Sequence, residues 1–193
     1  MTKNELRKIY LDKRIKLSDA ECAHFNLQLY NLFFSVVDLS FIKVLHTYLP
    51  IGKNHEPDTW PIIERIRREF PKIRISVPRV RSEGILENLY FEGLPQLQTN
   101  AWGIQEPKLG VPTPPEKIDL VIVPLVAIDS LGHRVGYGKG YYDRFLKTCR
   151  PDCRKIGLSF FQEVDGIADV SANDVRLDSC ITPQHALDFG TLS

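Results

Sequence analysis

The sequence predicts an α/β fold of three layers, with helices on both faces of a largely parallel central sheet. Helix signals alternate along the chain with short apolar runs, a pattern typical of buried parallel strands. The length of 193 residues and the hydrophobic content of 43% suit one compact core. We therefore expect a single domain over residues 1–193, without repeats or a low-complexity linker.

Two capping boxes mark the starts of two helices at the beginning of the chain. Thr2 and Glu5 form the first box, and apolar residues recur behind them at helical spacing. Ser18 and Glu21 form the second box. The helix that follows carries an apolar stripe typical of a core-packed element: Cys22, Phe25, Leu29, Leu32, Phe33 and Val36.

Short apolar runs and turn residues divide the remaining chain. We expect a strand over 42–49, a helix from 58 to 70 with Pro61 in its first turn, and a strand over 73–77. A strand pair over 84–91 should precede a Pro- and Gly-rich loop that extends to 115. A continuous buried strand over 117–128, a helix over 141–149 and a strand over 154–160 should follow.

Charge and composition exclude several classes of protein. Lys and Arg number 25 against 24 acidic residues, so a net charge of +1 gives no general affinity for nucleic acid or membranes. The longest apolar run, 120–128, is too short to span a bilayer, and the polar N-terminus does not resemble a signal peptide. We expect a cytoplasmic protein with reduced cysteines and without nucleic-acid or membrane partners. A monomer is compatible with this sequence, which carries no signal for oligomeric state.

The segment 129–146, directly behind the apolar run, has the composition of a phosphate site. Gly136, Gly138 and Gly140 lack a Cβ, so the backbone can turn its N–H groups toward an anion. Arg134 and Lys139 add positive charge, and a helix that begins after Gly140 directs its dipole at the same anion. Open α/β sheets bind ligands at this carboxyl end of their strands.

Two familiar glycine motifs do not fit this segment. A Walker A loop needs glycine where this chain has His133, and Ser or Thr where it has Gly140. The dinucleotide fingerprint needs a third glycine at the position of Tyr141. A glycine-rich strand-to-helix turn without a ligand therefore stays open as the alternative.

The whole motif resembles the signature of the 5-formyltetrahydrofolate cyclo-ligase family, also called methenyltetrahydrofolate synthetases. The matching residues occur in the family's order without a gap: Pro124, Asp129, Gly132, Arg134, Gly136, 138–143 and Leu146. Matches near the chain ends are Lys3, Leu6, Arg7, Asn173, Asp174 and Asp178. The resemblance thus covers essentially the whole chain.

The resemblance implies an ATP- and Mg²⁺-dependent cyclisation of 5-formyltetrahydrofolate to 5,10-methenyltetrahydrofolate, with release of ADP and phosphate. ATP would be the cosubstrate and Mg²⁺ the cofactor. The formyl oxygen would be phosphorylated first, and N10 would then attack the formyl carbon. Such a reaction requires positioning and charge neutralisation from the protein more than covalent chemistry.

The resemblance also assigns residues to ATP. Lys3 and Arg7 lie four residues apart and share one helix face, which would otherwise be read as a solvated basic face. Lys13 and Arg14 are weaker candidates further along the same helix. Implied for ATP are Lys3, Arg7, Arg134, Gly136, Gly138, Lys139, Gly140 and Tyr142, with Arg134 and Lys139 also catalytic.

Metal and folate residues follow from the same resemblance. Asp143 and Asp174 are the implied magnesium ligands, although the residues alone would equally fit a first-turn helix acid and a loop cap. Glu56 is the implied folate-binding carboxylate, with either Leu49 or Ile51 as its apolar neighbour. The aromatic candidates for the folate pocket are Trp102, Tyr141 and Tyr137, the last at a position where basic residues also occur in relatives.

A second class of function uses the same features. A non-catalytic nucleotide- or RNA-binding protein could employ the basic N-terminal helix and the glycine loop to bind phosphates. Such a protein would bind oligonucleotides with a steep salt dependence and would not require Asp143.

Overall fold

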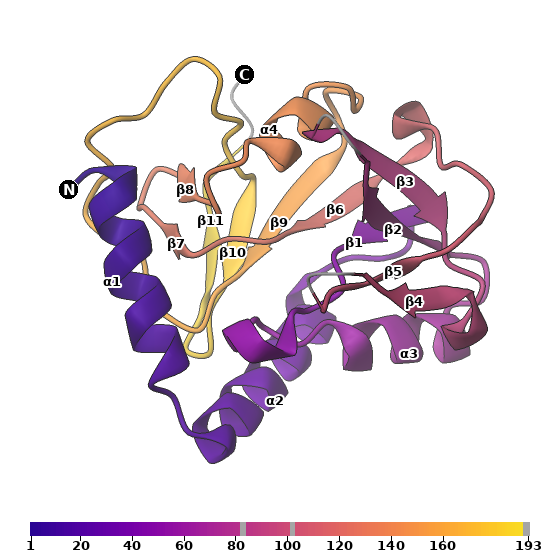
Figure 1. Cartoon of the computed structure of the whole chain (residues 1–193), viewed down its shortest axis with the longest axis horizontal. Coiled ribbons are helices and arrows are strands. Elements are labelled where there is room, and N and C mark those ends of the chain that lie inside the picture. The colour runs from indigo at the N-terminus through magenta and orange to yellow at the C-terminus, as the bar shows by residue number, and fades with distance from the viewer. Residues whose placement is uncertain (82–83, 101–102, 191–193) are drawn as a thin grey trace.

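A seven-stranded sheet forms the centre of the computed structural model, which describes residues 1–81, 84–100 and 103–190 (Figure 1). In spatial order its strands are β11 (Ala186–Asp188), β10 (Ser179–Ile181), β9 (Arg154–Leu158), β6 (Leu120–Val123), β1 (Val44–Thr47), β2 (Arg74–Val80) and β3 (Leu86–Tyr90). The strands from β10 to β2 are parallel, and the edge strands β11 and β3 are antiparallel to their neighbours. The predicted, largely parallel α/β sheet is confirmed.

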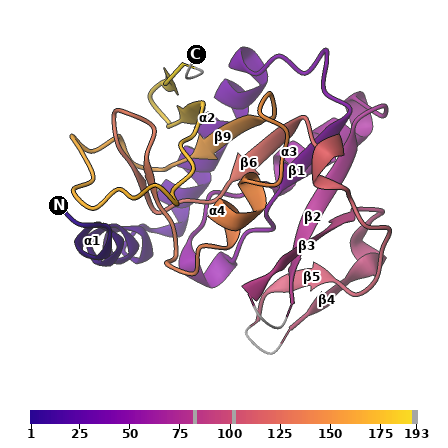
Figure 2. The ribbon, with the colours of Figure 1, turned by 90° about the horizontal axis from the view of Figure 1, so that it is seen from above.

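Helices cover both faces of this sheet. The α-helices in the described ranges are α1 (Lys3–Ile15), α2 (Asp19–Val36), α3 (Trp60–Glu69) and α4 (Tyr141–Leu146). Short 3₁₀ turns lie at Gly52–Asn54, Leu94–Gln96 and Pro115–Lys117. Figure 2 shows α4 on one side of the sheet and α2 and α3 on the other. None of these helices combines the length and the apolar character that a bilayer crossing requires, as far as the described residues extend.

Alternate residues of the central strands face different helix layers. Leu45 and Leu120 are fully buried in the cluster that includes the apolar sides of α2 and α3. Val44 and Val121 belong instead to the cluster that contains Phe145 of α4. Since fully burying such a side chain stabilises the fold by roughly 1.5–3 kcal/mol, the two clusters fix the sheet between its helix layers.

The first helix lies apart from both layers. Thr2 caps α1, and its reciprocal hydrogen bonds with Glu5 confirm the predicted capping box. Leu6 anchors α1 on a separate apolar cluster that also contains Val126 and Val135. This cluster surrounds the hairpin of β7 (Ala127–Ile128) and β8 (Arg134–Val135), which leads into the glycine motif (Figure 1). Helix α1 is therefore packed beside the predicted phosphate site.

Pro124 breaks the strand that was expected to run over 117–128. Strand β6 ends at Val123, where its pairing with β9 also ends, and only two residues of β7 remain beyond the break. The reason is that proline has no backbone N–H for the ladder, so it cannot continue a strand that is paired on both sides. The prediction of one continuous strand is wrong.

Other differences concern short elements. The segment 84–91 contributes one strand, β3, which pairs with β2 and not with a second strand of its own. The expected loop contains a hairpin of β4 (Leu97–Thr99) and β5 (Gln105–Pro107), and the sequence pattern did not predict β10 or β11. Strands of three residues are too short for an alternating pattern to be recognised. The helix expected over 141–149 ends at Leu146.

Candidate active site

A cavity of about 540 Å³ opens at the carboxyl ends of β1 and β6, where the predicted site should lie. Its walls come from α1, the loop behind β1, the glycine motif, α4 and the segment around Asp174. The candidate residues for ATP, metal and folate line this cavity, except Trp102, which lies outside the described ranges. The two weaker candidates of the first helix, Lys13 and Arg14, do not line it. The volume suits a small-molecule substrate, since such pockets span roughly 300–1,000 Å³.

The glycine motif forms one wall through backbone conformations that other residues avoid. Gly138 and Gly140 have φ angles of 88° and 66°, in the left-handed region that glycine adopts without strain. Arg7 fixes this loop to α1, because its Nε donates a hydrogen bond to the Gly136 carbonyl at 2.7 Å. The loop conformation therefore depends on both its glycines and the first helix.

The two cations of the motif have different surroundings. Lys139 is exposed and makes no ion pair or hydrogen bond with another residue in the described part of the chain. Arg134 is buried, and its guanidinium donates to Asp143 Oδ1 at 2.8 Å and to the Val175 carbonyl. Burial lowers the pKa of Arg134, although the neighbouring Asp143 carboxylate favours the charged form. Lys139 is thus open to a ligand, while Arg134 also orients a candidate metal ligand.

The two candidate metal ligands are brought together by the backbone. Asp143 Oδ1 accepts a hydrogen bond of 3.0 Å from the N–H of Val175, the residue that follows Asp174. Asp174 pairs with the Lys3 ammonium and accepts a 2.7 Å hydrogen bond from the Ser171 N–H. Burial acts to raise the pKa of Asp174, but these donors outweigh it and leave the pKa below its usual value. The carboxylate is therefore ionised at neutral pH.

This pair of carboxylates fits magnesium. Hard carboxylate oxygens are the ligands Mg²⁺ prefers, and it commonly takes one or two of them together with phosphate oxygens and water. No group of three or more His, Cys, Asp or Glu side chains is arranged for a metal in the segments that the structure describes. Asp143 and Asp174 would therefore need a phosphate-bearing ligand to complete the coordination of the ion.

The candidate folate carboxylate is buried at another part of the cavity. Glu56 is 7% exposed; its Oε2 accepts a 2.6 Å hydrogen bond from the Ile51 N–H, and its Oε1 accepts one from the Tyr137 hydroxyl. Burial raises the pKa of Glu56, against the effects of both hydrogen bonds and of the Arg14 charge. Leu49 and Ile51 both line the cavity, so the two alternatives for the apolar neighbour remain.

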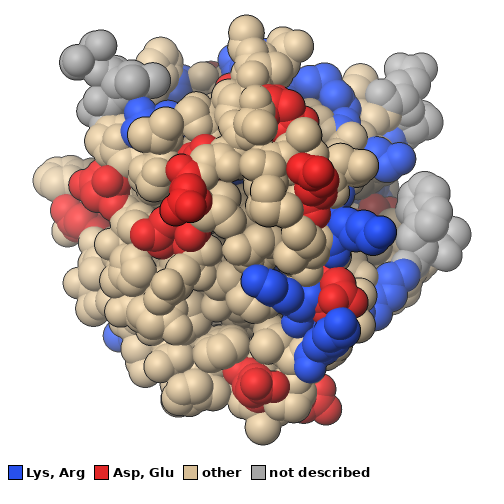
Figure 3. Space-filling model, turned by 90° about the vertical axis from the view of Figure 1, so that its left-hand side faces the viewer, with Lys and Arg blue, Asp and Glu red and all other residues tan. Residues whose placement is uncertain are grey.

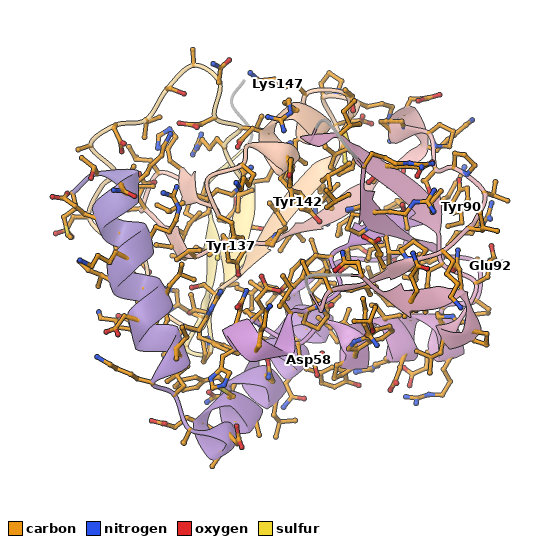
Figure 4. The ribbon with its side chains drawn as sticks, in the orientation of Figure 1. Asp58, Tyr90, Glu92, Tyr137, Tyr142 and Lys147 are labelled. Carbon is orange, nitrogen blue, oxygen red and sulfur yellow. The ribbon has the colours of Figure 1, made fainter. Side chains whose placement is uncertain are left out.

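The tyrosines of the motif contribute in different ways. Tyr137 and Tyr142 lie in the central region between α1 and β3 (Figure 4). The Tyr142 hydroxyl lies 3.4 Å from Nε2 of His46, a histidine of β1 that the sequence analysis did not single out. Burial lowers the pKa of His46 to about 3, which keeps its imidazole neutral. Tyr142 therefore joins the cavity wall to a polar group inside the sheet.

Sequence reasoning also missed an apolar part of the cavity wall. It is formed by β2, β3 and the residue before β5, through Pro78, Val80, Leu86 and Ile104. An apolar strand residue carries no local signal that separates a cavity wall from an ordinary core position. The pairing of β2 with β3 creates this wall, and only the fold shows it.

The surface gives no support to a nucleic-acid interface on the α1 side. Acidic and basic side chains lie side by side on this face, in the area that described residues form (Figure 3). A mixed surface does not provide the continuous positive field that binds a phosphate backbone.

The fold and the cavity define an α/β protein with a small-molecule pocket, a candidate anion site, at the carboxyl edge of its sheet. Comparison with known proteins identifies the family. The chain belongs to the 5-formyltetrahydrofolate cyclo-ligase family, whose model matches residues 1–183. The resemblance predicted from the glycine motif is thereby confirmed.

Known members of this family are similar in sequence to this protein over most of its length. The 5-formyltetrahydrofolate cyclo-ligase of Mycoplasma pneumoniae is 32% identical over 186 residues, covering 95% of this chain and all of the relative. The Escherichia coli K12 enzyme of the same name is 33% identical over 156 residues, covering 74% and 86%. The solved structure of Aquifex aeolicus 5,10-methenyltetrahydrofolate synthetase superposes with a TM-score of 0.83 at 30% identity, covering 98% and 93%.

A second solved structure extends the comparison. The 5,10-methenyltetrahydrofolate synthetase of Mycoplasma pneumoniae has a TM-score of 0.75 at 30% identity, covering 94% of this chain and 98% of that one. Family and structures together show that the chain is a ligase and support 5-formyltetrahydrofolate cyclo-ligase activity. The non-catalytic alternative is therefore set aside.

Proposed function

We propose that the chain catalyses the ATP- and Mg²⁺-dependent cyclisation of 5-formyltetrahydrofolate to 5,10-methenyltetrahydrofolate, with release of ADP and phosphate. The observation that carries this proposal is a single cavity with two kinds of wall. One part combines Lys139, a glycine loop and two carboxylates, and another presents the buried Glu56 among apolar and aromatic residues. Such a cavity can hold a polyphosphate and a flat heterocycle side by side.

The chemistry has two steps. The formyl oxygen attacks the γ-phosphorus of ATP, and the bond from this phosphorus to the β–γ bridging oxygen breaks. ADP departs as the leaving group, and the phosphorylated formyl group on N5 remains as an iminium phosphate. N10 then attacks the formyl carbon and loses its proton, and the C–O bond breaks to release phosphate. Both steps need the reacting atoms to be held close together and the developing charge to be neutralised.

Residues of the first helix and the glycine motif would bind the phosphates. Lys139 is available to the γ-phosphoryl group, and Arg7 and Lys3 approach the same region from α1. The backbone of the loop adds N–H donors, since Gly138 and Gly140 turn it through the left-handed region. Arg134 would stabilise the transferring group with those of its N–H groups that Asp143 and Val175 do not use.

Asp143 and Asp174 are proposed to hold the magnesium ion. When bound, the ion would neutralise phosphate charge and orient the transferring group. Lys3 already pairs with Asp174, so this lysine would keep the carboxylate ionised and in place before the nucleotide arrives.

Glu56 is proposed to bind the pterin. A carboxylate can accept hydrogen bonds from the amino group and ring N–H groups of such a heterocycle, and a site of this kind rejects ligands that leave it unpaired. Tyr141, with Leu49 or Ile51, would pack against the ring system. Tyr142 would close the cavity between the two ligands.

The reaction itself provides the test. Purified protein is mixed with 5-formyltetrahydrofolate and MgATP, and methenyl absorbance, ADP and phosphate are followed together. We expect equal amounts of the three products, and no product when ATP or magnesium is omitted. Methenyl formation without ATP, or ATP hydrolysis that is independent of folate, would contradict the proposal.

A further inference from the structure

Arg14 is a buried cation whose partners are not anions. It is 3% exposed and lies near the end of α1. Its Nε donates to the Asn54 carbonyl at 2.8 Å, its Nη1 to the Leu125 carbonyl at 3.4 Å, and its Nη2 to the Tyr137 hydroxyl. It forms no direct ion pair with any residue of the described ranges. Burying a charge in this way is costly unless another group compensates it.

The directions of the hydrogen bonds show what compensates it. Arginine can only donate, so the Tyr137 hydroxyl must accept from Arg14 and give its single proton to Glu56 Oε1. The Ile51 N–H, also a pure donor, occupies Oε2 of the same carboxylate. Both oxygens of Glu56 are therefore held by donors, an arrangement that favours the ionised form.

Arg14 is the positively charged group among the titratable side chains that face Glu56. The titratable groups that face Glu56 from neighbouring elements are Arg14 of α1, Tyr48 behind β1, Tyr137 behind β8 and Tyr142 of α4. Burial raises the pKa of each of these tyrosines, so they remain neutral donors. Tyr48 donates its proton elsewhere, to the Pro57 carbonyl.

The helix places Arg14 far from the phosphate region. Lys3 and Arg14 are separated by eleven residues, which corresponds to about 16 Å along an α-helix and a rotation of only about 20°. Lys3, Arg7 and Arg14 consequently lie on one face, with the first two at the carboxylates and the glycine loop. Arg14 reaches the Glu56 region instead.

We propose that Arg14 and Tyr137 are positioning residues for the folate substrate. Arg14, acting through the Tyr137 hydroxyl, opposes the effect of burial on Glu56 and holds its carboxylate in the cavity wall. This inference rests on the proposed role of Glu56 in folate binding. It also replaces the weaker phosphate-binding role that the sequence suggested for Arg14.

Tyr137→Phe is the sharpest variant, because it removes the hydroxyl and keeps the ring in the cavity wall. A hydrogen bond to a charged group is lost, so the KM for 5-formyltetrahydrofolate should rise by about tenfold or more, whereas the KM for ATP should change by less than about twofold. The acidic limb of the kcat/KM profile for folate should move to higher pH. The sign follows because Glu56 loses a donor that lowers its pKa.

Arg14→Met removes the charge and should reproduce both effects, while Arg14→Lys should restore part of the folate affinity. Combining Arg14→Met with Tyr137→Phe should be no worse than the poorer single variant, because both act through one carboxylate. Lys8→Met is the matched control: it removes an exposed charge from the same helix and should change neither KM.

Glu56→Gln separates this inference from the proposed function. An unchanged folate KM in that variant would remove the role of Glu56, and with it the basis of the inference. A raised folate KM in Glu56→Gln together with normal values and an unshifted pH limb in Tyr137→Phe would overturn the inference alone. If Arg14→Met does not fold, Tyr137→Phe decides the question by itself, since it preserves the packing of the ring.

Discussion

Lys139 is the cation of the cavity that lies most open to a ligand within the described residues. It is exposed, and none of the carboxylates described around it forms an ion pair with it. A lysine in this state can follow a moving phosphoryl group, because its flexible stem carries a point charge with three donors. Arg134, held by Asp143 and Val175, supplies positive charge from a fixed position instead.

Lys139→Ala should therefore lower kcat strongly while the fold persists. Loss of a charge that stabilises the transferring phosphoryl group is expected to cost about 3–4 kcal/mol, a few hundredfold in kcat. Steady-state kinetics at saturating ATP measure the effect. Lys72→Ala, an exposed lysine in the turn before β2, serves as the control and should retain normal turnover. Near-normal turnover of Lys139→Ala would remove this lysine from the mechanism.

The two carboxylates should respond alike to magnesium but differently to heat. Asp143→Asn and Asp174→Asn should each raise the magnesium concentration required for half-maximal activity, because a neutral amide is a weaker ligand for a hard cation. Asp143→Asn should also lower Tm further than Asp174→Asn does, since it leaves the buried Arg134 without its carboxylate.

Magnesium titrations and thermal melting of both variants check this expectation. Asp152→Asn, at an exposed carboxylate paired with Arg150, is the control and should leave the magnesium requirement unchanged. Titrations that do not move for Asp143 or Asp174 would show that these carboxylates are structural.

At the scale of single elements, local sequence signals predicted where helices begin. They did not predict which strands pair with one another. The capping boxes at Thr2 and Ser18 place the starts of α1 and α2, because the residues that make these hydrogen bonds lie within one helical turn. The interruption at Pro124 and the strands β10 and β11 depend on which strands pair in space. Short strands with such partners leave little pattern in the sequence.

Gly138→Ala tests the coupling between the glycine loop and α1. Its φ of 88° is unfavourable for alanine, and a Cβ would lie 3.3 Å from Arg7 Cζ. The strain should cost roughly 1–3 kcal/mol of stability, and displacement of Arg7 should raise the KM for ATP. Melting curves and ATP titrations measure these effects. Gly166→Ala, where no atom lies within 4 Å of the added Cβ, should leave both values unchanged.

At the scale of the whole molecule, the site joins distant parts of the chain. The resemblance identified the glycines and most of the charged residues of the cavity, from one contiguous motif, from matches near both chain ends and from Glu56. It gave Arg14 only as a weaker phosphate candidate, because the contact between Arg14 and Tyr137, 123 positions further along the chain, exists only in the fold. Nor could it identify the wall formed by Pro78 and Leu86, which exists only once β2 and β3 pair. The expectation for Trp102 stays a prediction.

Leu6→Ala should show how far catalysis depends on the packing of α1 against the rest of the protein. Leu6 is 2% exposed and anchors the helix on its own small cluster, so its truncation should loosen α1 at a cost of about 2–5 kcal/mol. The KM values for ATP and folate should rise together, because α1 contributes to both regions. Leu29→Ala in the main core is the control: it should lower Tm while leaving both KM values of the folded enzyme unchanged.

The continuity of α1 also restricts which changes in chain length the enzyme can accept. Each residue inserted into an α-helix turns everything beyond it by about 100° and moves it by about 1.5 Å. One extra residue between Arg7 and Arg14 would preserve the helix and every side chain, yet it would direct Arg14 away from the Tyr137 hydroxyl. Insertions in the turn between α1 and α2 lie beyond Arg14, so they do not rotate Lys3, Arg7 and Arg14 relative to one another. The contact between Arg14 and Tyr137 therefore depends on the spacing within this helix as well as on the identity of Arg14.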